Sequence, residues 1–119
     1  MSWNVSIVDP KTKEVQNLLE RHDLRGGTYA LGGTTEASLN ITYNYGDIFR
    51  KVLPKVDDAD GIKSIHQKSS KDSIPLLKNA VTELRDDKSD NYWESTEGNA
   101  QAALMNLIEL AEKAPEGIW

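Results

Sequence analysis

The sequence predicts an α+β domain in which a small N-terminal antiparallel sheet of about three strands packs against three helices. Two observations support this fold class. Apolar and polar residues alternate near the start of the chain, which is typical of half-buried strands, whereas apolar residues recur every three or four positions further on, which is typical of helices. A chain of 119 residues also fits a single domain, residues 1–119, with one modest core.

The first strands are predicted from alternation and turn residues. Trp3, Val5 and Ile7 alternate with polar residues, and the segment 9–13, which contains Asp and Pro, is typical of a turn. Residues 15–19 are therefore expected to return as the second strand of a hairpin. A third short strand is expected at residues 28–31, between the glycine pairs at 26–27 and 32–33.

Residues 34–53 fit two patterns. Alternation favours a strand with Ala37, Leu39, Ile41, Tyr43 and Tyr45 on one face. A helical stripe at spacings of four, four, three and four is formed by Ala37, Ile41, Tyr45, Ile48 and Val52. The stripe continues beyond Gly46, where the alternation fails; Thr34 would cap the helix, and Pro54 would end it. We therefore predict a helix, with the strand as the alternative.

Two further helices follow from apolar stripes and capping residues. One is expected to begin near Asp72 or Ser73, with Pro75 in its first turn and a stripe of Ile74, Leu77, Val81 and Leu84. The last is expected to be capped by Ser95 or Thr96 and to end before Pro115, with an inward stripe of Ala100, Ala103, Leu104, Leu107, Ile108 and Ala111. Three aromatic residues, Tyr92, Trp93 and Trp119, are predicted at the edge of the core.

The composition excludes several classes of function. The formal net charge is −5, and the densest basic stretch, residues 63–71, has no interleaved aromatics, so nucleic-acid binding is not expected. Cysteine is absent, which removes disulfides and thiolate chemistry. No run approaches the roughly 18 apolar residues of a membrane span, and Met1–Asn4 does not open a signal peptide, so we expect a cytoplasmic protein without a membrane partner.

The candidate site lies on the predicted helix of residues 34–53. Helical spacing would place two carboxylates, two amides and a phenol on one face, from the residues Glu36, Asn40, Tyr43, Asn44 and Asp47. Gly32 and Gly33 would let the backbone approach a ligand closely, and Thr34 stands where the helix would start. This face predicts a binding module for a small polar ligand or a protein partner; the plainer reading is a solvated face with turn glycines.

Two other classes of function stay open. A small metal-dependent or acid/base hydrolase would use Glu36 and Asp47 together with His22 or His66. A homo-oligomeric scaffold would use the Trp and Tyr residues for self-association. Neither a phosphate-binding loop nor a dinucleotide fingerprint is present, and the acidic run 57–60 lacks the spacing of an EF-hand, so the sequence names no cofactor.

Several motifs resemble a group of small uncharacterised proteins found in bacteria and in their phages and prophages. The motifs are spread over most of the chain: Arg25–Tyr29 (RGGTY), Gly32–Ala37 (GGTTEA), Leu39–Gly46 (LNITYNYG), Gly61–Ile62, Ser73–Leu77, Tyr92–Trp93, Thr96–Ala100 and the tail PEGIW. The resemblance implies no activity, cofactor or catalytic residue. It implies a phage-related context, which favours an accessory binding protein.

Overall fold

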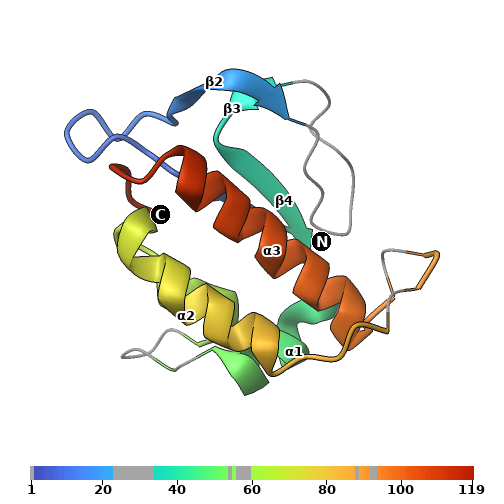
Figure 1. The fold of residues 1–119 in the computed structure, drawn as a ribbon. Coiled ribbons are helices and arrows are strands. Elements are labelled where there is room, and N and C mark those ends of the chain that lie inside the picture. Colours follow the sequence, from blue (N-terminus) through green and yellow to red (C-terminus); the bar gives the residue numbers. More distant parts are fainter. Residues whose placement is uncertain (1, 23–33, 54, 56–59, 88, 92–93) are drawn as a thin grey trace.

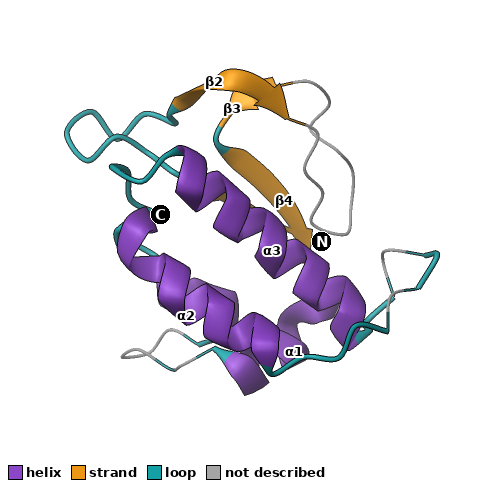
Figure 2. Ribbon diagram, viewed as in Figure 1, coloured by secondary structure: helices purple, strands orange, loops and turns teal. Residues whose placement is uncertain are grey.

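The computed structural model describes residues 2–22, 34–53, 55, 60–87, 89–91 and 94–119 and shows an α+β fold. Helices α2 and α3 run side by side, and the strands lie on the other side of α3 (Figures 1 and 2). The order of elements along the chain is β1 (Ser2–Ser6), β2 (Asn17–His22), β3 (Thr34–Glu36), β4 (Ser38–Thr42), η1 (Tyr43–Tyr45), α1 (Gly46–Val52), η2 (Gly61–Ile65), α2 (Ser70–Thr82) and α3 (Glu97–Lys113).

The described strands form two antiparallel pairs instead of one three-stranded sheet. β1 pairs with β4 from Ser2–Thr42 to Ser6–Ser38, and β2 pairs with β3. The predicted hairpin exists only near its turn, where Asp9 Oδ1 accepts from the backbone N–H groups of residues 11 and 12 and Val8 bridges Val15. Beyond the turn the two arms diverge to other partners. The strand expected at residues 28–31 lies outside the described residues.

The prediction of one helix over residues 34–53 is wrong for its first half. Both patterns are genuine, but each applies to a different half of the segment. Alternation holds through β4, whose Leu39 and Ile41 are buried on the core side. Thr42 then ends the strand, because its hydroxyl accepts from the N–H of Asn44 and caps η1. From Tyr45 onward the helical spacing takes over and leads into α1.

The two long helices are present, and their predicted apolar stripes are confirmed fully for α3 and in part for α2. In α2 only Leu77 of the stripe is buried, and Leu84 lies beyond the end of the helix. α3 begins after the cap Thr96, whose Oγ1 accepts from Asn99 N at 3.0 Å, and every residue of its predicted inward stripe is buried. α2 begins at Ser70, earlier than expected, so Pro75 lies inside the helix and not in its first turn. Leu77 and Ala80 of α2 are fully buried against this core.

The segment Gly117–Trp119 is inserted between the N-terminal strands and the start of α2. On one side Val8 and Ile118 exchange two backbone hydrogen bonds, at 2.8 and 3.0 Å. On the other side the segment bonds residues 67–70, through Trp119 N to Lys68 O, Gln67 N to Trp119 O and Ser70 N to Gly117 O. Trp119, which was predicted at the edge of the core, is buried in it, and its Nε1 donates to Ser73 Oγ at 2.8 Å. Tyr92 and Trp93 lie outside the described residues.

Tyr45 and Phe49 form the aromatic centre of the core beside α1. Both side chains are almost completely buried, and their rings meet edge to face with centroids 5.9 Å apart. Burial disfavours the phenolate and raises the pKa of Tyr45 from 10.0 to about 12.

Substitution of Gly117 by alanine is expected to destabilise the protein by about 1–3 kcal/mol, because overpacked sites cost that much. A Cβ at this position would lie 2.3 Å from Ile7 Cγ2 and 3.0 Å from Val8 O. In the control Gly46→Ala, the new Cβ would meet nothing closer than 3.5 Å, so stability should change by less than about 0.5 kcal/mol. Urea unfolding measures both; equal losses in the two variants would contradict the predicted clash.

Stability is expected to fall as the pH rises from 10 toward 12. In this range the unfolded chain loses the Tyr45 proton while the folded protein, with its raised pKa of about 12, retains it. The loss reaches about 2–3 kcal/mol at the upper end, from two pKa units at 1.36 kcal/mol each. Chemical unfolding at several pH values measures it. Tyr45→Phe should show a smaller fall over the same range; an identical fall would refute the assignment to Tyr45.

Candidate functional site

The residues of the predicted site do not share one helical face. They lie on four successive elements, with Thr34 and Glu36 in β3, Asn40 in β4, Tyr43 and Asn44 in η1, and Asp47 in α1. Gly32 and Gly33 lie outside the described residues. Of the set, Tyr43 and Asp47 lie close to the site described below, whereas Asn40 and Thr34 have structural contacts.

Asn40 is buried in the sheet and serves the pairing of β1 with β4. Its Nδ2 donates to Asn4 Oδ1 at 2.7 Å, next to a hydroxyl pair between Ser6 and Ser38 at 2.7 Å. Thr34 is likewise used locally, since its Oγ1 accepts from the N–H of Glu36. The amide that the sequence suggested for ligand binding is thus part of a polar ladder between two strands.

The described residues do not bring together the groups that the hydrolase alternative requires. His22 is buried, and its Nε2 lies 2.6 Å from the main-chain oxygen of Glu36, a contact to the backbone and not to the carboxylate. The carboxylate of Asp47 is paired with Arg50 one turn further along α1. Within the part of the chain that the structure describes, no three acidic or histidine side chains are placed to hold a metal ion.

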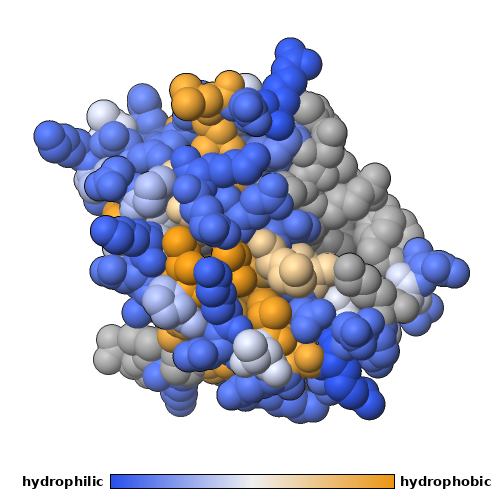
Figure 3. Space-filling view, viewed as in Figure 1, coloured by the Kyte–Doolittle hydropathy of each residue, from blue (hydrophilic) through white to orange (hydrophobic). Residues whose placement is uncertain are grey.

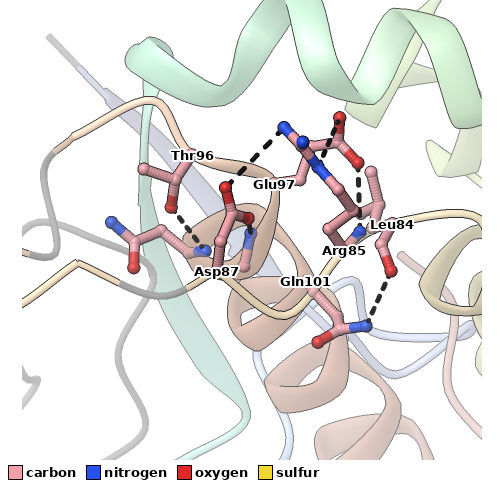
Figure 4. A network of polar contacts seen from close by, with 8 residues as sticks. Leu84, Arg85, Asp87, Thr96, Glu97 and Gln101 are labelled. Carbon is pink, nitrogen blue, oxygen red and sulfur yellow. Dashed lines mark hydrogen bonds and ion pairs between the residues drawn. The ribbon is translucent and has the colours of Figure 1, made fainter.

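A second polar cluster joins the end of α2 to the start of α3 (Figure 4). Asp87 accepts from the N–H of Gly98, and Glu97 accepts from the N–H of Arg85, both at 3.0 Å. Gln101 donates to the carbonyls of Val81 and Leu84 at the end of α2. These side chains satisfy backbone groups at helix ends and in the connecting loop, so the cluster holds two helices together.

The helical side of the molecule carries a mostly polar surface with shallow depressions. Figure 3 shows a mostly hydrophilic surface there, with apolar atoms along the line between α2 and α3 and over β2, the strand that carries the fully exposed Leu19. The shallow depressions beside α1 and α2 are lined by a mixture of residues such as Lys51, Val52 and Glu83.

A groove of about 570 Å³ lies beside β1. We call it the β1 groove. One wall is formed by β1 and Val8, and the other by η2 and the residue after it; the lining residues are Trp3, Asn4, Val5, Ser6, Val8, Ile62, Lys63, Ile65, His66 and Trp119. Its volume is within the range of about 300–1,000 Å³ that is usual for ligand sites. Most of the lining is apolar, with Lys63 and His66 contributing nitrogen groups.

The backbone of β1 turns hydrogen-bonding groups toward this groove. Ile7 N donates to Ala37 O at the position that continues the β1–β4 register. Because antiparallel partners alternate between bonded and non-bonded pairs, Val5 and Trp3 bond β4, whereas Asn4 and Ser6 direct N–H and C=O to the opposite edge. Among the described residues no backbone partner is found for these groups of Asn4 and Ser6. Val8 follows on the same edge, and there Ile118 is its partner.

A smaller pocket of about 200 Å³ adjoins the groove and shares Trp3, Ile62 and Lys63 with it. We call it the Trp3 pocket. The rings of Trp3 and Tyr43 meet there with centroids 4.6 Å apart, and the Trp3 pocket is completed by Gly46, Arg50, Asp60 and Gly61. It therefore combines two aromatic rings with the cationic groups of Arg50 and Lys63.

Most residues of this site were not singled out by the sequence. Trp3 and Val5 were recognised as strand residues and Lys63 as part of a basic stretch. His66 was considered for the hydrolase alternative. The available signal was an aromatic residue, Trp3, in the first predicted strand, but the second wall comes from η2, whose approach to β1 depends on tertiary structure.

The chain matches no protein-family model, no curated protein and no solved structure. Within the described residues, no helix has both the length and the apolar character that a membrane crossing requires.

Asn40→Ala is expected to destabilise the protein by about 1–3 kcal/mol, because it removes a buried hydrogen bond and leaves Asn4 Oδ1 without this donor. Asn79→Ala, on the exposed face of α2, is the matched control and should change stability by less than about 0.5 kcal/mol. Thermal and urea unfolding compare them. Wild-type stability in Asn40→Ala would show that this amide is not structural.

Proposed function

We propose that the protein is an interaction module that binds an extended segment of a partner protein along the open edge of β1. The observation that carries the proposal is the combination of two features: backbone groups of Asn4 and Ser6 that have no partner among the described residues, and the apolar β1 groove beside them. Strand addition uses these two features together: backbone bonds supply affinity, and alternate side chains enter apolar surface.

The chain provides an internal example of the same interaction. Ile118 is already bound to this edge as an antiparallel partner of Val8, two residues beyond Ser6. A partner segment at Ser6 and Asn4 would extend the pairing that Gly117–Trp119 begins. The apolar rings of Trp3 and Trp119 would cover its side chains. The resemblance to phage-related proteins is in keeping with an accessory protein that acts through binding.

The probes are three fluorescently labelled, end-blocked hexapeptides in which valine alternates with a second residue. The second residue is serine in one, aspartate in another and lysine in the third. At least one is expected to bind in the micromolar range. Ser6→Pro removes the N–H that faces the groove but no backbone bond to β4, so affinity should fall about tenfold, the equivalent of about 1.4 kcal/mol, while the fold is retained. It also removes the hydroxyl pair with Ser38, a loss that Ser6→Ala shares. Ser6→Ala is the matched control and should bind as the wild type does. Fluorescence anisotropy measures each affinity.

Two outcomes would overturn the proposal: no binding by any of the three peptides, or equal affinity for wild type and Ser6→Pro. If Ser6→Pro unfolds, peptides with methylated backbone nitrogens replace it, since they cannot donate to β1; undiminished binding of these peptides would also refute strand addition. A second copy of this chain is the other candidate to occupy the edge, and sedimentation at several concentrations tests for it. A dimer of the wild type that Ser6→Pro abolishes would assign the edge to a second copy instead of a partner.

A further inference from the structure

The charge of the proposed site differs from that of the whole chain. The net charge is −5, yet two cations, Lys63 and Arg50, line the two adjoining cavities together with His66 and one carboxylate, Asp60. Arg50 is already paired with Asp47, so Lys63 is the lining cation for which no ion pair is found among the described residues. An acidic protein thus presents the ammonium group of Lys63 beside its open strand edge, with no ion-pair partner among the described residues. This contrast favours a partner of opposite charge at this place.

Lys63 occupies the central position in this arrangement. It lines both the β1 groove and the Trp3 pocket, so a group bound at Lys63 stands where the two cavities meet. Arg50 approaches from α1 on the far side of Gly46, and a Cβ built on Gly46 would lie 3.5 Å from both Arg50 Nη1 and Trp3 Cη2. The guanidinium and the indole therefore converge on the same small space.

The dimensions of the Trp3 pocket suit one side chain. Its volume of about 200 Å³ is below the range of about 300–1,000 Å³ for sites that hold a whole small molecule. The rings of Trp3 and Tyr43 offer apolar contact to methylene groups, while Lys63 and Arg50 offer charge. A glutamate or aspartate side chain combines these two properties.

We infer that the partner segment carries an acidic side chain, which enters the Trp3 pocket and pairs with Lys63 while the segment's backbone lies along β1. The inference rests on the proposed function, because it specifies the segment that strand addition would bind. The acidic group sets the choice of partner and speeds association, and the backbone pairing holds the segment.

A charge exchange at Lys63 tests this inference. The wild type should bind the aspartate peptide about tenfold more tightly than the lysine peptide, with the serine peptide between them. Lys63→Glu should reverse this order, and added salt should weaken the preference in both proteins. Lys51→Glu is the matched control, because it changes the net charge equally but lies on α1 beside other depressions. It should keep the wild-type order.

The outcomes separate the two claims. If Ser6→Pro weakens binding but Lys63→Glu keeps the wild-type order, strand addition stands and the acidic side chain is refuted. If Lys51→Glu reverses the order as strongly as Lys63→Glu, the preference comes from net charge, and the inference fails. The inference is supported if Lys63→Glu reverses the order of the peptide affinities, Lys51→Glu does not, and Ser6→Pro still weakens the binding of the peptides.

Discussion

The structure depends on the insertion of Gly117–Trp119 between the N-terminal strands and the start of α2. Backbone bonds tie this segment to Val8 on one side and to residues 67–70 on the other. The contact needs close approach, and Gly117 allows it because no side chain intervenes before Ile7. The buried bonds of Ser73 to Trp119 and of Ser70 to the carbonyl of Ala114 hold the segment against α2.

This insertion also shapes the site. Since one wall of the β1 groove belongs to β1 and the other to η2, the distance between the walls is set where the inserted segment bonds to both neighbours. The groove thus continues the strand edge at which Val8 pairs with Ile118. Its chemistry is set separately, by Trp3 and Lys63, which come from the two walls.

The sequence predicts those features that depend on local pattern. The cap at Thr96 and the stripes of α2 and α3 are of this kind, because a helix buries residues only a few positions apart. Residues 34–53 show the limit, since alternation and helical spacing overlap there and the strand is selected by pairing with β1, far away in the sequence. The site is less predictable still. Asn40 carries an amide of the kind that binds ligands, but this amide bonds Asn4 in the neighbouring strand. Lys63 joins the site only because η2 lies opposite β1 in the folded protein.

The pairing of Val8 with Ile118 has a consequence for how the protein folds. It closes a loop that spans most of the sequence, and contacts of such high sequence separation form late because their closure costs chain entropy. During synthesis on the ribosome, the edge of β1 therefore emerges long before residue 118 reaches it. In that interval the whole edge from Asn4 to Val8 is open to other chains. The chain is therefore most exposed to aggregation before Ile118 pairs with Val8.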